Sequence, residues 1–485
     1  MFSKSVFLAL SVSIFLFLPS IAEVSSKQMD MNSIALTIET IRSLEKEDLQ
    51  VHFKKIIDKK TDPDFYIKVW INGELFVSDI YWNTKYLYNI DWKVSKEIPS
   101  DVTEVPIRLQ LWDAADENIK EDRLCDLNQR IGDSDADKEI NLIYNMKTGE
   151  WEGDDYRGDP SGYGRLNGCD DGSIYVQELD VELWFKITQD DPDGDGIPSW
   201  VETNVYGTDP YKDDTGLDYD GDGIPIEWEW KWGYDPFTWD NHSSLDPDGD
   251  SITNWEEYYM RNWSSDPYRV DLFVEMDQMI GPNGEPGMFP EGGKEILFTA
   301  FDRQNIVLHL DDGRMGKESR SDLIPFDDLT ECFWNRFDEL DEIYETYFLN
   351  EKDGDIRRGI FHYGVVIYQS SLVNGNIFGP NRFQISAKGM EDKFKNDIFL
   401  NDRDVIYASA YMHELGHTFN FHPIPGHNRY SYYPWQIGFW LSRPYKSCMN
   451  YGYMYYTVDY SDGTHGFNDY DDWERMDLSF FEEDW

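Results

Sequence analysis

The sequence predicts a multidomain protein with an N-terminal antiparallel β-sandwich, a central array of acidic loop repeats and a C-terminal α/β (α+β) domain. Three observations support this prediction. Short runs of alternating apolar and polar residues fill residues 31–187, a twelve-residue acidic pattern recurs within residues 188–268, and strand and helix patterns alternate through residues 269–485. The 485 residues suffice for about three domains of ~150 residues each.

The first 22 residues, MFSKSVFLALSVSIFLFLPSIA, have the pattern of a secretory signal peptide. Lys4 precedes an apolar run at residues 6–18 and a small-x-small cleavage motif at residues 20–22. The alternative is a membrane anchor, but the run is short for a bilayer span, and no later segment is apolar over such a length. We therefore expect cleavage of this segment and a secreted, extracellular or cell-surface protein.

The chain is strongly acidic: 94 Asp and Glu oppose 43 Lys and Arg, for a formal net charge of −51. This charge argues against nucleic acid as a partner, because phosphate binding requires clustered basic residues. It suits a protein that binds many hard cations through carboxylates. The abundance of Tyr, Trp and Phe argues against a disordered acidic chain.

Four cysteines are present, and an even number in an exported protein allows two disulfides. Proximity in the sequence favours the pairs Cys125–Cys169 and Cys332–Cys448, one in the sandwich and one in the C-terminal domain. The alternative is that the cysteines are buried free thiols.

In the N-terminal region the clearest strands are FYIKVWI (65–71), VPIRLQLW (105–112) and DVELWFKI (180–187), with turn residues between them. This pattern is typical of an antiparallel β-sandwich. An acidic, glycine-rich stretch at residues 150–172 is expected to form a long loop.

Acidic residues flank two of these strands: Asp62 and Asp64 precede the first, and Asp113 and Asp116 follow the second. The segments DPDFYIKVWING and LQLWDAAD resemble the calcium-loop edges of C2-type β-sandwiches. The resemblance implies a domain that holds calcium between two end loops and docks on membrane lipid. The alternative is an acidic β-sandwich of another family.

Three segments of the central region repeat one pattern: DPDGDGIPSWVE (191–202), DYDGDGIPIEWE (218–229) and DPDGDSITNWEE (246–257). A twelve-residue calcium loop has carboxylates at positions 1, 3 and 5, a sharp turn at position 6, a main-chain carbonyl ligand at position 7 and a bidentate glutamate at position 12. The predicted calcium ligands are Asp191, Asp193, Asp195, Ile197 and Glu202; Asp218, Asp220, Asp222, Ile224 and Glu229; and Asp246, Asp248, Asp250, Ile252 and Glu257. This calcium-loop repeat array resembles the thrombospondin type 3 and EF-hand-like arrays of exported proteins. At position 6 of the third loop, Ser251 replaces the usual glycine.

Strand and helix patterns alternate in the C-terminal region. Strands are predicted at residues 269–277, 305–313, 362–369 and 381–386, and helices at residues 291–304, 327–348 and 404–420. Asp404 is the expected N-cap of the last helix.

The last of these helices carries the motif HELGH at residues 413–417. His413 and His417 stand four residues apart, so both imidazoles lie on one helical face and can reach one zinc ion. Glu414 is placed to take a proton from zinc-bound water as the general base. The motif predicts hydrolysis of a peptide bond, with zinc lowering the pKa of water toward ~7 and polarising the carbonyl.

Met449 lies 32 residues beyond His417, within KSCMNYGYMYY (446–456). Together with HELGH, this segment resembles the metzincin clan of zinc endopeptidases, in which a Met-containing turn lies beneath the metal. The resemblance implies a metzincin-like catalytic domain in which Met449 is the floor of the zinc site. It also implies that Tyr451 contacts the zinc or steadies the oxyanion.

The sequence does not identify the third protein ligand of the zinc ion. Where the metzincin motif has Gly and then a third His, this chain has Asn420 and Pro423. Asn tolerates the left-handed conformation that the helix end requires, but Pro cannot bind metal. His422, directly after the bend, and His427, after the stiff turn PIPG, are the alternatives. Carboxylates farther along the chain are a further alternative, namely Asp469, Asp471 or Asp472.

The sequence therefore predicts a secreted, calcium-stabilised zinc endopeptidase that acts on protein or peptide substrates. The alternative is a non-enzymatic, calcium-dependent adhesion or surface-binding protein with a degenerate protease domain. The intact Glu414 argues against that alternative, because a protein without activity need not keep its general base. A lipid-docking protein is a third hypothesis, which rests on the two sandwich loops alone.

Overall fold

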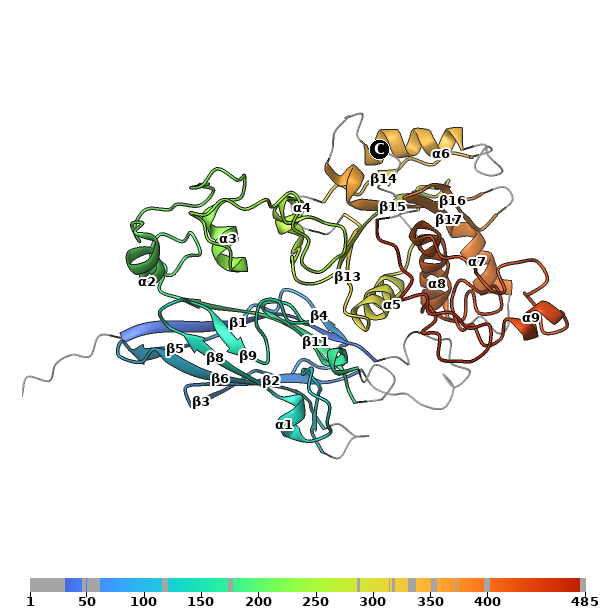
Figure 1. Ribbon diagram of the computed structural model, residues 1–485. Coiled ribbons are helices and arrows are strands. Elements are labelled where there is room, and N and C mark those ends of the chain that lie inside the picture. The colour runs from blue at the N-terminus through green and yellow to red at the C-terminus, as the bar shows by residue number, and fades with distance from the viewer. Residues whose placement is uncertain are drawn as a thin grey trace, which may run out of the picture.

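The computed structural model describes most of the chain between residues 31 and 479. The described residues are 31–45, 49, 62–115, 121–172, 178–285, 288–313, 315, 319–329, 337–349, 356–370, 373–396 and 402–479. The predicted signal peptide, Asp116 and Cys332 lie outside them. Figure 1 shows a β-sandwich in blue and cyan, a region of loops and short helices in green, and a domain with a central sheet in yellow to red.

Two antiparallel sheets form the N-terminal sandwich. The first has the order β10-β11-β1-β4, with β5 also paired to β1, and the second has the order β3-β2-β6-β8-β9, with β7 also paired to β6. The first sheet consists of β1 (Met31–Ser43), β4 (Tyr86–Leu87), β5 (Trp92–Pro99), β10 (Arg165–Asn167) and β11 (Val181–Gln189). The second consists of β2 (Phe65–Ile71), β3 (Glu74–Val77), β6 (Glu104–Asp113), β7 (Arg123–Leu124), β8 (Ile140–Asn145) and β9 (Trp151–Gly153). Two short turns of helix, α1 (Asp135–Lys138) and η2 (Gly168–Asp171), lie between strands.

The sandwich core consists of the inward-facing residues of both sheets, such as Leu36 of β1, Val69 of β2 and Leu109 of β6, which are all fully buried. The strands predicted at residues 65–71, 105–112 and 180–187 are confirmed as β2, β6 and β11. The long loop expected at residues 150–172 is wrong in part, because this stretch contains β9 and β10. Trp151 and Leu166 belong to the sandwich core, and their burial draws the segment onto the two sheets.

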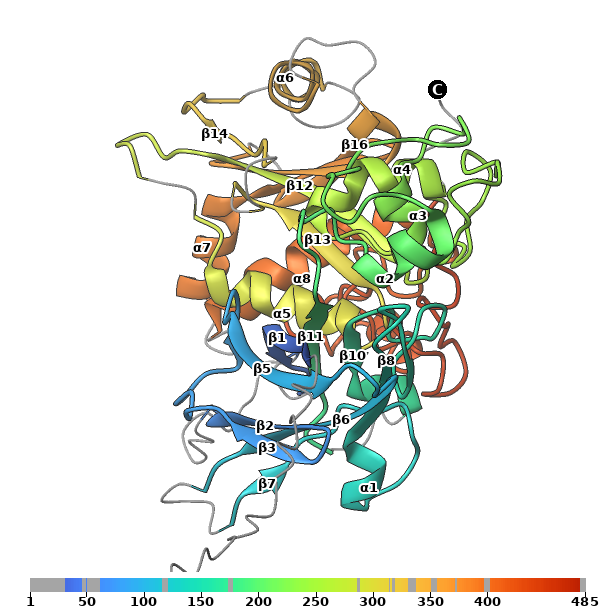
Figure 2. The same ribbon diagram turned by 90° about the vertical axis from the view of Figure 1, so that its left-hand side faces the viewer.

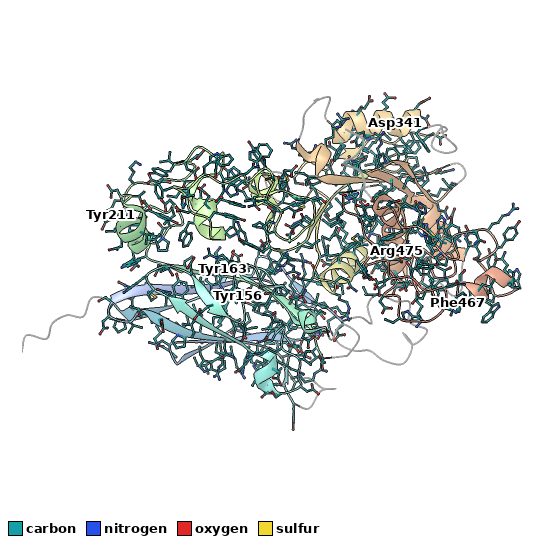
Figure 3. All side chains as sticks on the ribbon, viewed as in Figure 1. Tyr156, Tyr163, Tyr211, Asp341, Phe467 and Arg475 are labelled. Carbon is teal, nitrogen blue, oxygen red and sulfur yellow. The ribbon has the colours of Figure 1, made fainter. Side chains whose placement is uncertain are left out.

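Short helices follow each acidic loop of the central region. They are α2 (Ser199–Val201) with the π-helical turn η3 (Glu202–Tyr206), α3 (Ile226–Trp232), and α4 (Asn254–Met260) with the 3-10 turn η4 (Arg261–Trp263). Tyr163 of the sandwich lies between the sandwich and this region (Figure 3), since its ring stacks on Trp151 at 3.9 Å and meets Trp232 of α3 edge-on at 6.2 Å. Aromatic packing thus anchors the loop region to the sandwich.

The C-terminal domain is built on a mixed sheet of order β13-β12-β15-β17-β16, with β14 also paired to β12. Its strands are β12 (Asp271–Met279), β13 (Val307–Asp311), β14 (Leu323–Ile324), β15 (Phe361–Ile367), β16 (Gly375–Gly379) and β17 (Arg382–Ser386). β16 is an antiparallel edge strand beside β17, whereas β13, β12, β15 and β17 run parallel. Every residue of β12, β13 and β15 is buried, as expected for parallel strands covered on both faces.

Helices cover the two faces of this sheet. Val274 of β12 packs with α5 (Glu291–Asp302) and α8 (Arg403–Gly416), whereas Phe273 packs with α6 (Asp338–Ile343) and its π-helical continuation η6 (Tyr344–Phe348). Figure 2 shows α6 on one side of the sheet, and α5 and α8 on the other. The remaining helices are η7 (Ile356–Gly359), α7 (Ala387–Asn396), η8 (His417–Phe419) and α9 (Ile437–Leu441). Within the described residues, no helix has both the length and the apolar character of a membrane span.

A buried group of charges, which we call the arginine network, joins the sandwich to the C-terminal domain. Glu182 of β11 accepts a hydrogen bond from Arg165 Nε at 2.6 Å and lies 3.1 Å from Arg269 Nη2. Asp302, the last residue of α5, accepts a hydrogen bond from Arg42 Nη1 of β1 at 2.7 Å. The five side chains are at most 10 % exposed, so water and salt screen their interactions only weakly.

Cys125, Cys169 and Cys448 are buried free thiols. The predicted Cys125–Cys169 disulfide is therefore wrong, and Cys448 does not pair with Cys332 as predicted. Burial raises the pKa of all three thiols, and Cys169 Sγ lies 3.6 Å from a carboxylate oxygen of Asp180. Proximity in the sequence was a poor guide, because a disulfide requires a narrow range of distances and directions between two cysteines.

We predict that Glu182→Gln destabilises the fold by about 3–5 kcal/mol, because it leaves buried arginines without one of their two carboxylate partners. Lys186→Ala is the matched control on the same strand, since it removes an exposed ion pair with Glu39 and should cost about 0–1 kcal/mol. Urea unfolding in calcium buffer, followed by tryptophan fluorescence, measures both. Equal losses in the two variants would contradict a structural role for the network.

Candidate metal centre

Helix α8 and the 3-10 turn η8 that continues it hold two of the predicted zinc ligands, His413 and His417, on one face. Asp402, and not the predicted Asp404, is its N-cap, because the Asp402 side chain accepts a hydrogen bond from the Val405 N–H. The ring centroids of His413 and His417 are 5.0 Å apart, as expected for side chains separated by one helical turn.

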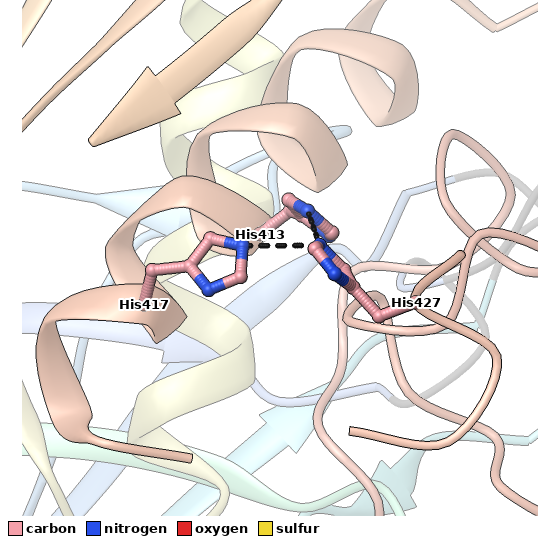
Figure 4. A group of neighbouring side chains, drawn as sticks. All are labelled: His413, His417 and His427. Atoms are coloured by element: carbon pink, nitrogen blue, oxygen red, sulfur yellow. Dashed lines mark hydrogen bonds between the residues drawn. The ribbon is translucent and has the colours of Figure 1, made fainter. Parts of the chain in front are cut away.

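The chain reverses after the helix and returns a third histidine to it. Asn420 ends the helix in the predicted left-handed conformation, with φ 57° and ψ 33°. His427 Nε2 lies 3.2 Å from His417 Nε2 and 3.2 Å from His413 Nε2 (Figure 4). His422, the other candidate, is exposed and is not part of this group.

The three imidazoles fit a tetrahedral zinc ion. Zinc–nitrogen bonds of about 2.05 Å at tetrahedral angles place two ligand nitrogens about 3.3 Å apart, and the observed separations are 3.2 Å. His413 Nδ1 lies 2.8 Å from the Cys448 carbonyl oxygen, so Nδ1 is the donor and Nε2 keeps its lone pair for a metal. Burial lowers the pKa of His413 to about 3 and that of His427 to about 4, and it lowers the pKa of His417 as well. The three side chains are therefore neutral, as metal binding requires.

Met449 lies directly against the HELGH helix. Its side chain is fully buried, and a Cβ built on Gly416 would lie 2.5 Å from its Sδ. The glycine between the histidines therefore leaves the space that the thioether occupies. The preceding residue, Cys448, supplies the carbonyl that orients His413. The segment after HELGH thus supports the histidines from beneath and also fixes one of their rings.

Tyr451 lies against the histidines. Its ring centroid is 4.2 Å from that of His427 and 5.6 Å from that of His413, and it stacks on Tyr432 at 4.6 Å with 8° between the rings. Burial raises the pKa of Tyr451, so its hydroxyl keeps its proton and can donate a hydrogen bond. The sequence analysis did not identify Tyr432, because its contact with Tyr451 depends on the path of the loop after His427. Further exposed aromatic residues lie near Tyr432 in the sequence, namely Tyr430, Tyr433, Trp435 and Trp440.

Glu414 occupies space that β16 leaves open. Its side chain is buried, and burial raises its pKa to about 8. A Cβ built on Gly375, the first residue of β16, would lie 2.4 Å from Glu414 Oε1 and 2.8 Å from its Cδ. The absence of a side chain at position 375 therefore sets where the carboxylate lies. No sequence motif indicated that Gly375 belongs to the site.

The distant carboxylates that could have served as a third ligand make other contacts. Asp472 accepts a hydrogen bond from Tyr445 Oη at 2.8 Å, and Asp469 accepts one from Ser461 Oγ at 2.6 Å. Neither these two nor Asp471 belongs to the three-histidine group.

The three acidic loops of the central region share one main-chain geometry. In each, the position-1 carboxylate accepts hydrogen bonds from the N–H groups of positions 4 and 6, at 2.8 and 2.9 Å for Asp191, 2.7 and 3.0 Å for Asp218, and 2.8 and 3.1 Å for Asp246. The position-5 carboxylates accept hydrogen bonds from the position-7 N–H groups, in the pairs Asp195–Ile197, Asp222–Ile224 and Asp250–Ile252. Ser251 has φ 75°, the same left-handed conformation as the glycines at position 6 of the other loops, so the third loop keeps the turn.

Other carboxylates of these loops are buried and lack hydrogen-bond partners. Within the described residues, such oxygens belong to Asp193, Glu202, Asp220, Glu229, Asp248 and Glu257. The position-12 glutamates Glu202, Glu229 and Glu257 are all 0 % exposed. Burial raises the pKa of Glu202 to about 7 and that of Glu229 to about 8. Because unpaired buried carboxylates are costly unless they are protonated or bind a cation, these loops could hold metal ions.

The carboxylates at the acidic end of the sandwich differ from those of the central loops in their hydrogen-bond partners. Asp113 accepts hydrogen bonds from the Asp64 N–H at 2.9 Å and from Arg123 Nη2 at 2.5 Å, and Asp64 accepts one from the Asn83 N–H at 2.7 Å. Arg123 therefore neutralises one of the two carboxylates. Calcium and lipid binding by the sandwich stay predictions.

Fold and side chains together define a multidomain protein in which an antiparallel β-sandwich and a mixed α/β domain carry clusters of histidines and carboxylates that could hold metal ions. No protein-family model and no curated sequence matches the chain. It is similar to human GIVD cytosolic phospholipase A2, with 13 % identity over 33 % of this chain and 18 % of that chain and a TM-score of 0.18. A calcium-bound pair of C2 domains from extended-synaptotagmin 2 shows 10 % identity over 33 % of this chain and 45 % of that chain, with a TM-score of 0.19. A C2 domain protein from Ramazzottius varieornatus shows 11 % identity over 33 % of this chain and 89 % of that chain, with a TM-score of 0.17. The chain spans less than a fifth of the length of the phospholipase.

We predict that His427→Asn weakens zinc binding at least 100-fold, because it removes one of three protein ligands, whereas His422→Asn leaves zinc binding unchanged. Titration of the metal-free variants with zinc against a competing chelator measures both affinities. The reverse order of effects would assign the third ligand to His422.

Proposed function

We propose that this protein is a secreted, calcium-stabilised zinc endopeptidase. The observation that carries the proposal is the convergence of three histidines, in which His427 Nε2 lies 3.2 Å from both His413 Nε2 and His417 Nε2, with Glu414 next to His413 in the sequence. Three neutral nitrogen ligands leave a fourth tetrahedral position open, which is typical of catalytic rather than structural zinc sites. Protein or peptide substrates follow from the HELGH motif and the metzincin-like Met-turn.

Each residue of the centre has a role in this proposal. A zinc ion held by the three histidines supplies Lewis acidity, which makes water more acidic and a carbonyl carbon more electrophilic. Glu414 accepts the proton of the attacking water and delivers it to the leaving amine. Tyr451, which lies against His427, donates a hydrogen bond to the oxyanion that develops on the substrate. Met449 and the Cys448 carbonyl hold the histidine rings in place.

The acidic loops stabilise the protein in this proposal by binding calcium. Their buried carboxylates repel one another when no cation is present, so binding of calcium to the folded chain alone favours the folded state. Extracellular calcium is abundant enough for sites of modest affinity, which agrees with the proposed secretion.

The test of the enzymatic proposal is Glu414→Gln. We predict that this variant keeps its zinc content and thermal stability but cleaves denatured casein at least about 100-fold more slowly, because it lacks the general base. Zinc analysis, thermal unfolding and release of labelled peptides measure the three quantities. Wild-type protein that holds zinc but cleaves no denatured protein, or an active Glu414→Gln variant, would favour the non-enzymatic surface-binding alternative.

We predict that Gly375→Ala lowers kcat by about 10–100-fold without loss of zinc, because its methyl group displaces the Glu414 carboxylate while the histidines stay in place. Ile377→Ala, on the same strand and 40 % exposed, is the matched control and should keep its activity. Steady-state kinetics and zinc analysis on the same preparations separate displacement of the base from loss of metal. Full activity in Gly375→Ala would show that the base lies elsewhere.

We predict that calcium removal lowers the midpoint of thermal unfolding by roughly 5–10 °C or more, since each site filled to a hundredfold excess over its Kd contributes about 2.7 kcal/mol. The protein is treated with EGTA and then given back its zinc, so that the change reports calcium alone. Calcium should restore the midpoint, and magnesium, which resists dehydration, should not. An unchanged midpoint would argue against stabilisation by the loops.

A further inference from the structure

The second acidic loop has a neighbour that its calcium-loop pattern does not include. His242 Nε2 lies 3.2 Å from Asp222 Oδ2 and 3.9 Å from Glu229 Oε1. The ligand atoms of these three residues lie within 4.8 Å of one another. At the first loop the corresponding group is Asp191, Asp193 and Asp195, which offers oxygen ligands alone.

The His242 ring is held in one position. The residue is 1 % exposed. Trp228 and Tyr234 meet its ring edge-on at 5.8 and 4.8 Å, and the Asn254 side-chain amide lies 3.1 Å from its Nδ1. The ring therefore presents Nε2 to the loop. With its side-chain amide turned so that Oδ1, an oxygen without a hydrogen-bond partner, faces the ring, Asn254 accepts a hydrogen bond from Nδ1–H and leaves the Nε2 lone pair for a cation.

Two of the three residues of this group, His242 and Glu229, have ligand atoms that no hydrogen bond satisfies, whereas Asp222 Oδ2 accepts one from the Asp240 N–H at 3.2 Å. Within the described part of the chain, His242 Nε2 and both carboxylate oxygens of Glu229 have no hydrogen-bond partner. All three atoms are buried, and Glu229 is 0 % exposed. Leaving a buried imidazole nitrogen and a buried carboxylate unpaired is costly, and a cation between them would satisfy both.

The kind of ligand decides the kind of cation. Calcium takes oxygen ligands, whereas imidazole together with carboxylates suits zinc and related transition-metal ions. We infer that the second loop binds a divalent transition-metal ion of the zinc class through Asp222, Glu229 and His242, at a site separate from the three-histidine centre. The inference replaces calcium at the second loop alone and leaves the first and third loops to calcium. It rests on the proposal that the acidic loops bind divalent cations, and it does not depend on protease activity.

Cobalt is the probe, because it can replace zinc both in the three-histidine centre and in the second-loop site. The number of cobalt ions bound per chain can also be measured. The full-length protein is stripped of metal and dialysed against cobalt in the presence of millimolar calcium. We expect about two cobalt ions per wild-type chain, about one in His242→Gln and about one in His427→Asn. His465 also faces two carboxylates, Asp462 and Asp469, so any ion lost in His465→Gln is counted apart from these two sites. His422→Asn, at an exposed histidine outside these groups, is the control and should keep both ions.

A second variant tests the preference of the site. His242→Asp makes the group all-oxygen and should exchange one cobalt ion for one calcium ion, with the total number of bound cations unchanged. One cobalt ion per wild-type chain that is kept in His242→Gln and lost in His427→Asn would overturn the inference. Equal cobalt content in His242→Gln and wild type would also overturn it. If His427→Asn instead lost no cobalt, the proposed catalytic centre would fail while the second-loop site stood.

Discussion

The arginine network is the interaction on which the arrangement of the three parts depends. Arg42, Arg165 and Glu182 belong to strands of the sandwich, Asp302 ends α5, and Arg269 lies two residues before β12. Five charges at this depth are unfavourable unless they pair closely. The network is therefore complete only when the sandwich, the end of the loop region and the C-terminal domain come together.

The arginine network also determines how the helices of the C-terminal domain are placed relative to the sandwich. α5 contacts the sandwich through its last residue and packs against α8 on the same face of the sheet. α8 and its continuation η8 in turn carry two of the three histidines, and the Cys448 carbonyl orients one of them. The position of the three-histidine group is thus tied to the sandwich through two helices.

Local spacing made half of the metal centre predictable. The helical positions of His413 and His417 and the left-handed Asn420 follow from a few neighbouring residues, and so do the turns of the acidic loops. The choice of His427 over His422 does not, because it depends on how the chain folds back after the helix. Gly375 comes from an edge strand about forty residues before Glu414 and could be recognised only from the packing of two elements. The same reason explains the wrong disulfides, since closeness in the sequence does not bring two cysteines into contact.

The third acidic loop contacts the sheet of the C-terminal domain directly. Asp250 accepts a hydrogen bond from the N–H of Asp271, the first residue of β12, at 2.8 Å. Asp271 in turn bonds His309 of the neighbouring strand β13 at 2.8 Å. Burial and the nearby carboxylates raise the pKa of Asp250 and Glu257, so this end of the loop is unfavourable without a cation. A cation in the third loop would relieve that repulsion at the start of β12, and the sheet beneath α8 would then transmit the stabilisation to the three-histidine group.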